Sequence, residues 1–218
     1  MVPGPPEWFG RTFSTPRFEP YLRASSGDAT SAWRLYRWNI EVSEAFYGPL
    51  HCLEIGLRNA EHDRLRSRYG RADWWTVAPL RQHDSCKITK ALEDLRRKGV
   101  RAPSADDVVA ATTFGLWVSL LSRAYDRHFW VPTLHRAFPH YSGGREPLRD
   151  NLQSMVLLRN RIMHHEPIHH RHLSADHAKI HRLLGYLQPP VSTWLKGFDR
   201  VPGILARRPV KARGDESA

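Results

Sequence analysis

Apolar side chains recur every three or four residues along most of this chain, which is the spacing of amphipathic helices. No stretch alternates apolar and polar residues as a half-buried strand would, so the pattern predicts an all-α fold. We expect a helical bundle in a single domain over residues 14–205. The predicted helices cover residues 14–27, 29–69, 84–98, 104–125, 129–138, 146–165 and 174–187, followed by a short one around Trp194.

Helix-start and helix-stop residues place several of these boundaries. Pro16 suits the first turn of a helix, and Gly27 suits the position just after its end. Pro49, preceded by a glycine, is expected to kink the long helix. Ser104 opens a sequence that resembles a capping box, whereas Thr113 and its neighbours are expected to loosen the helix that follows.

The two ends of the chain have a different composition from the rest. Residues 1–13 are rich in proline and glycine, so we expect a flexible N-terminal arm. Residues 206–218 are charged and basic, with the sequence ARRPVKARGDESA. We expect them to form a disordered tail.

The most informative stretch is LLRNRIMHHEPI, residues 157–168. At about 100° per residue, Arg159 lies in the middle of the apolar face of the helix over 146–165. A cation in that position must be paired or must face a cleft, because an unpaired buried charge is too costly. Asn160 and His164 are one turn apart, so Asn160 can orient the imidazole. Pro167 then disfavours helix at Glu166 and ends the run.

The spacing Arg159-Asn160-x-x-x-His164 resembles the signature of the HEPN superfamily, whose catalytic members are ribonucleases that need no metal ion. The longer string LLRNRIMHHEPI is similar to the Abi-like (abortive infection) branch of that superfamily, and so are the upstream strings EAFYGPLHCLEIGLRNAEH and TFGLWVSLLSRAY. The resemblance covers roughly residues 15–200 and implies a helical fold of HEPN type. It also implies that Arg159, Asn160 and His164 are catalytic.

A second polar group lies upstream, where Glu54, Arg58 and His62 follow one another at i, i+4 spacing. One interpretation is a surface ladder of ion pairs. The other is support for the signature, because the helical wheel places Glu54 inside an apolar stripe. In that case Glu54 or Asn59 approaches Arg159 and holds its guanidinium. The string Leu57-Arg58-Asn59 repeats Leu158-Arg159-Asn160, which is too short a match to show a duplication.

The net charge and the cysteine content limit the possible partners and the cellular location of the protein. The formal net charge is +11, and of 33 basic residues 27 are arginine, which suits bidentate contact with phosphate groups. Cys52 and Cys86 have no metal-ligand spacing. The N-terminus lacks the apolar core of a signal peptide, and no apolar run reaches the length of a membrane span. We therefore expect a soluble cytoplasmic protein with RNA, rather than a membrane, as its partner.

Histidines are concentrated between residues 164 and 181, and His177 and His181 have i, i+4 spacing. No cysteine or aspartate lies nearby at ligand spacing. We therefore predict no metal ion and no other cofactor, and interpret the cluster as a source of positive potential at mildly acidic pH.

The resemblance implies an endoribonuclease active in abortive infection, antiphage defence or as a toxin. His164 would move protons and Arg159 would stabilise the phosphate, with His165 and Glu166 as supporting residues. In that family two signatures commonly meet across a dimer, so we expect a homodimer or a higher homo-oligomer. An RNA or protein antitoxin would restrain it. The alternatives are a catalytically inactive module that binds RNA, nucleotide or a partner protein, and an interaction subunit whose basic charge is incidental.

Overall fold

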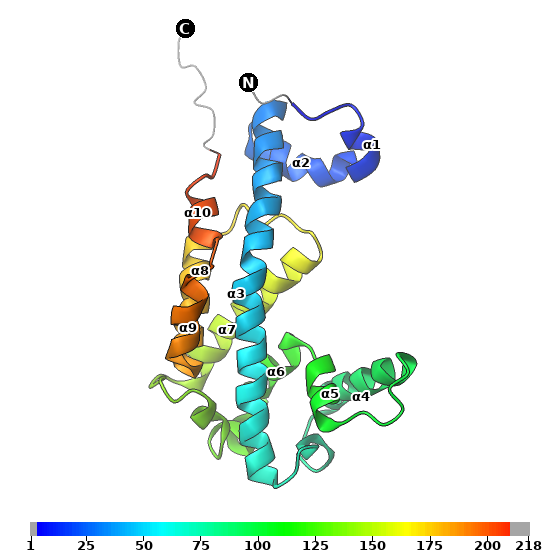
Figure 1. Ribbon diagram of the computed structural model, residues 1–218, viewed down its shortest axis with the longest axis vertical. Helices are drawn as coiled ribbons and strands as arrows, with labels where there is room; N and C mark the ends of the chain where they lie inside the picture. The colour runs from blue at the N-terminus through cyan, green and yellow to red at the C-terminus, as the bar shows by residue number, and fades with distance from the viewer. Residues whose placement is uncertain (1–3, 210–218) are drawn as a thin grey trace. The chain divides into compact units, whose positions relative to one another are not determined.

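The computed structural model describes residues 4–209, and within that range every regular element is helical (Figure 1). The all-α prediction is therefore confirmed, with no strand among the described residues. The elements are α1 (Phe9–Phe13), α2 (Thr15–Ala24), α3 (Ala29–Tyr69), η1 (Trp74–Thr76), α4 (Gln82–Arg97), α5 (Ala105–Ala111), α6 (Phe114–Leu120), η2 (Arg123–Tyr125), η3 (Asp126–Trp130), η4 (Leu134–Ala137), α7 (Arg145–Met163), α8 (Leu173–Leu187), α9 (Pro189–Lys196) and α10 (Val201–Leu205).

The described residues form two compact units that share three helices. Within the described chain, the first unit comprises residues 4–49, 158–178 and 198–209, and the second comprises residues 50–157 and 179–197. Helices α3, α7 and α8 each begin in one unit and end in the other without a break in the helix. No helix among the described residues combines the length and the apolar character needed to cross a membrane.

An aromatic cluster forms the core of the first unit, where α1 and α2 lie against the first turns of α3 (Figure 1). The Phe9 ring packs edge-on against Trp33, Tyr36 and Phe18, with ring centroids 4.9, 5.1 and 5.1 Å apart. Phe9 is almost completely buried. Residues 9–13 were predicted to belong to a flexible arm, and that prediction is wrong for them. Burial of an aromatic ring outweighs the cost of ordering the short segment that carries it.

The C-terminal end of the first unit is also held in place. The indole N–H of Trp38 donates to the carbonyl of Ile204 at 2.8 Å, and the Arg208 guanidinium lies over the Trp38 ring. Arg208 also donates to the His169 carbonyl at 2.7 Å. Residues 206–209, which belong to the predicted disordered tail, are therefore ordered. Its residues 210–218 lie outside the described residues.

In the second unit, Trp74 and Trp117 occupy the core with Phe129. Helix α4 begins and ends within two residues of the predicted helix. Ser104 caps α5 in a capping box, as expected, because its hydroxyl accepts the N–H of Asp107 and the Asp107 carboxylate accepts the N–H of Ser104.

The helix predicted over residues 104–125 is broken, and this prediction is wrong. Thr112 and Thr113 have extended backbone angles, so α5 ends at Ala111 and α6 begins at Phe114. The Thr112 hydroxyl donates to the Val109 carbonyl at 2.7 Å and accepts the Trp117 indole N–H at 2.9 Å. Threonine competes for backbone hydrogen bonds in this way, and that is why it ends the helix here.

Candidate functional site

The signature residues lie at the C-terminal end of α7 and just beyond it. Two backbone hydrogen bonds close the helix: the His165 N–H donates to the Ile162 carbonyl at 3.0 Å, and the Glu166 N–H donates to the Arg161 carbonyl at 2.8 Å. His165 has a φ of 57°, in the left-handed region. This pattern is a Schellman motif, in which a left-handed residue satisfies the last carbonyls of a helix. It ends α7 two residues before the predicted end.

The three predicted catalytic residues differ in exposure. Arg159 and Asn160 are partly exposed, whereas His164 is exposed. The His164 N–H still donates to the Asn160 carbonyl at 2.9 Å, so the backbone of His164 continues the last helical turn. Asn160 and His164 therefore keep the i, i+4 relation that the sequence predicted, although no side-chain hydrogen bond between them is present.

Two residues outside the signature fix the segment that follows it. The Asn39 Oδ1 atom accepts the N–H groups of Ile168 and His169, at 2.9 and 3.1 Å, in a buried position. Arg17 donates from Nη1 to the His165 carbonyl at 2.8 Å. Neither role was predictable from the sequence, because each residue acts across more than a hundred residues of chain and neither belongs to a local motif.

A cavity of about 640 Å³ lies beside this helix end, entirely within the first unit. His165 and Glu166 line it, together with Ile162 and Met163 from α7. The opposite walls carry aromatic rings and one cation, from Phe13, Arg17, Tyr21, Tyr36 and Tyr47. The combination of aromatic surfaces with a few polar groups is typical of a site for a small planar group.

Two of the histidines that follow, His169 and His170, are less basic than an ordinary histidine. The pKa of His169 is lowered to about 4. Burial is the main cause, and the electrostatic effects of His170 and Arg208 act in the same direction. Burial also lowers the pKa of His170, and Arg161 and Arg171 add to that effect. Both imidazoles are therefore less readily protonated than an ordinary histidine. With a pKa of about 4, His169 does not contribute to the positive potential at mildly acidic pH that was predicted for the cluster.

The upstream residues Glu54, Arg58, Asn59 and His62 lie on the part of α3 that belongs to the second unit. The Glu54 carboxylate accepts the first N–H of α6, that of Phe114, at 3.2 Å. Arg58 donates to the Ala110 carbonyl at 3.2 Å. Arg58, Asn59 and His62 line a second cavity, of about 300 Å³. The expected approach of Glu54 or Asn59 to Arg159 stays a prediction.

His62 is buried and serves the core of the second unit. Its Nδ1 atom accepts the indole N–H of Trp74 at 3.1 Å, so the neutral ring carries its proton on Nε2. Burial lowers the pKa of His62, which favours this neutral form. This hydrogen bond gives His62 a structural role that its spacing from Arg58 did not reveal.

Two buried carboxylates were not found by sequence reasoning. Glu61 is completely buried, and neither carboxylate oxygen has a hydrogen-bond partner. Burial raises the pKa of Glu61 well above its usual value, which favours the protonated form. Asp84 is also buried, but it accepts hydrogen bonds from Ser119, Tyr125 and Lys87 at 2.7, 2.8 and 2.9 Å. The helical wheel alone would have shown that Glu61 shares a face with Leu57 and Leu65.

No protein-family model matches this chain, and no curated protein or solved structure matches it either.

Proposed function

We propose that this protein is an endoribonuclease of HEPN type that cleaves RNA without a metal ion, in the cytoplasm, as part of abortive infection, antiphage defence or a toxin–antitoxin pair. The observation that carries the proposal is the placement of Arg159, Asn160 and His164 at one end of a continuous helix, with His164 exposed. The resemblance of LLRNRIMHHEPI to the Abi-like branch supplies the reaction.

In this reaction His164 accepts the proton of a ribose 2′-hydroxyl, and the 2′-oxygen attacks the adjacent phosphorus. The bond to the 5′-oxygen breaks, and the protonated His164 gives a proton to that oxygen. Arg159 stabilises the extra negative charge that develops on the phosphate. Histidine suits the two proton transfers because it titrates near neutral pH. The products carry a 2′,3′-cyclic phosphate on one fragment and a 5′-hydroxyl on the other.

Two further features support RNA as the substrate. The net charge of +11 favours a polyanionic partner. The aromatic walls of the cavity beside the helix end suit an unstacked base, since sequence-tolerant binding of single strands relies on stacking against such rings. Because one chain carries one full signature, the proposal includes a homodimer in which two copies bring their signatures together. An RNA or protein antitoxin would restrain the activity in resting cells.

The test is a cleavage assay on end-labelled RNA with the purified wild-type chain and three variants, in EDTA. We expect wild-type protein to cleave and to leave 2′,3′-cyclic phosphate ends. His164→Ala should lose cleavage while it keeps its fold, by circular dichroism, and its affinity for RNA. Arg159→Ala should lose cleavage and also bind RNA more weakly, because a phosphate contact is lost.

His165→Ala is the matched control, since His165 is the neighbouring exposed histidine but has the left-handed backbone conformation that ends α7. It should reduce activity only modestly. Cleavage by His164→Ala at the wild-type rate, or strict dependence on Mg²⁺, would overturn the proposed mechanism.

The cavity also favours a second function, that of an inactive HEPN module that holds RNA or a nucleotide. That function predicts RNA binding whose affinity falls steeply with salt, without cleavage by the wild-type chain.

A further inference from the structure

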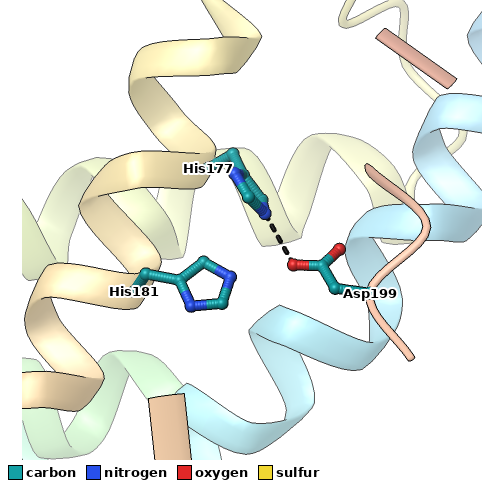
Figure 2. A group of neighbouring side chains, drawn as sticks. All are labelled: His177, His181 and Asp199. Atoms are coloured by element: carbon teal, nitrogen blue, oxygen red, sulfur yellow. Dashed lines mark hydrogen bonds and ion pairs between the residues drawn. The ribbon is translucent and has the colours of Figure 1, made fainter. Parts of the chain in front are cut away.

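Helix α8 carries His177 and His181 one turn apart, and a third potential ligand reaches the same place from a distant segment. His177 Nε2 lies 2.6 Å from Asp199 Oδ2, in the segment that joins α9 to α10. One ligand atom from each of His177, His181 and Asp199 can be chosen so that all three lie within 4.8 Å of one another. Figure 2 shows both imidazoles projecting from α8 towards the carboxylate.

We propose that His177, His181 and Asp199 form a binding site for a divalent transition-metal ion, with Zn²⁺ as its best match. The sequence predicted no metal at these two histidines, because it shows no cysteine or aspartate nearby at ligand spacing. The fold supplies one 18 residues after His181. Two imidazoles and one carboxylate are a common ligand set for zinc, and a fourth position then remains for water.

The helix geometry fixes the first two ligands. Because α8 is unbroken from Leu173 to Leu187, residues four apart project from the same face. This is the spacing that the two histidines of zinc-binding His-Glu-x-x-His helices use. The relation of His177 to His181 follows from the helix alone.

The burial of Asp199 is what distinguishes this group from an ordinary surface pair. Its side chain is only 3% exposed and that of His177 is 17% exposed. Taking a carboxylate out of water is costly unless a cation and hydrogen bonds compensate for the lost hydration. The Asp199 Oδ1 atom accepts the Val201 N–H at 3.0 Å, which leaves Oδ2 directed at His177. A divalent ion bound here would compensate the buried charge of this carboxylate.

A hydrogen bond also orients the second imidazole. His181 Nδ1 lies 3.0 Å from the Ser192 hydroxyl oxygen. Histidine ligands of metals usually donate their other ring N–H to an oxygen in this way, which fixes the tautomer and leaves Nε2 as the ligand. We therefore assign Nε2 of both histidines and Oδ2 of Asp199 as the ligand atoms. Binding would displace the proton shared by His177 and Asp199 and move those two atoms to about 3.3 Å apart, as tetrahedral zinc requires.

The experiment measures zinc binding by the full chain, prepared without a histidine tag, stripped with EDTA and desalted. Titration with ZnCl₂ at neutral pH, by calorimetry and by competition with a coloured chelator, should give one tight site per chain. His177→Ala, His181→Ala and Asp199→Asn should each weaken that site at least about tenfold. His172→Ala is the matched control, because His172 is an exposed histidine of the same cluster outside the group, and it should bind as wild type does.

A second readout keeps the test decisive if a variant is unstable. Co²⁺ bound to the wild-type chain should give the visible absorption of a tetrahedral site, and zinc should raise the melting temperature in a concentration-dependent way. Both effects should be absent in folded His181→Ala protein. A wild-type chain without a tight zinc site would overturn the proposal, and so would equal affinity in His177→Ala, His181→Ala and His172→Ala.

This inference is independent of the proposed RNA cleavage. All of its readouts are made without RNA, so failure of one proposal leaves the other standing. If zinc does stabilise the chain, the EDTA cleavage assay should be run below the melting temperature of the metal-free protein.

Discussion

The Asn39 carboxamide oxygen accepts the backbone N–H of Ile168 at 2.9 Å, which ties α3 to the segment directly after the signature helix. The same oxygen accepts the N–H of His169 at 3.1 Å. One side chain thereby satisfies two buried backbone donors that have left helical geometry. The position of the chain after His164 depends on this contact.

Asn39→Ala should therefore destabilise the protein by about 2–4 kcal/mol, because two buried donors would lose their partner. The free energy of unfolding, measured with urea, checks this value. Asn151→Ala is the control, since Asn151 donates to the Pro147 carbonyl at an exposed position, and it should cost much less. Equal effects of the two variants would show that the Asn39 contact is not important for stability.

His165→Gly should stabilise the protein by about 0.5–1 kcal/mol, because glycine adopts the left-handed region without the steric cost that a side chain pays. His165→Ala keeps that cost and should give no gain. Thermal unfolding of the two variants provides the comparison. A lower melting temperature for His165→Gly would mean that the imidazole itself stabilises the helix end.

Glu61→Leu should stabilise the protein at neutral pH by roughly 1–3 kcal/mol, because it removes a buried polar group without a partner. Burial raises the pKa of Glu61 in the folded state, whereas the unfolded group ionises near its ordinary value of 4.5. The wild-type chain should therefore lose stability as the pH rises above that value. The loss should continue until the pH reaches the folded pKa.

Glu61→Gln serves as the isosteric control for that experiment. It should abolish the pH-dependent loss while it keeps a buried polar group, so its gain should be smaller than that of the leucine variant. Urea unfolding at several pH values separates the two effects. An unchanged pH slope in Glu61→Gln would show that Glu61 is not the responsible group.

Asp84→Ala should destabilise the protein by roughly 2–4 kcal/mol, because it leaves Ser119, Tyr125 and Lys87 without their common acceptor. Burial opposes ionisation of Asp84, but the three hydrogen bonds outweigh it and lower the pKa of the carboxyl. Its contribution is therefore present above the ordinary value of 3.8 and should be lost as the pH falls through the folded pKa.

Asp94→Ala is the matched control on the same helix, since Asp94 pairs with Arg97 at the surface. Exposed pairs contribute less than about 1 kcal/mol, so this variant should unfold almost as wild type does. A similar loss of stability in both variants would contradict the role assigned to Asp84.

The local pattern of the sequence by itself determined the helical class and most helix boundaries. Apolar spacing predicted α4 and α7 to within two residues, and the capping box at Ser104 was readable because it needs only four consecutive residues. The same locality explains why Arg159, Asn160 and His164 were found as a group. Residues one turn apart share a helix face whatever the rest of the chain does.

The tertiary structure decided everything that depends on a partner distant in sequence. Phe9 is ordered by Trp33 and Tyr36, and the helix predicted over 104–125 breaks where Thr112 meets Trp117. Whether a histidine is basic depends on its burial, as His169 shows. Asp199 joins His177 only after α8 and α9 have turned the chain back. Such contacts follow from packing, which periodicity along the chain does not encode.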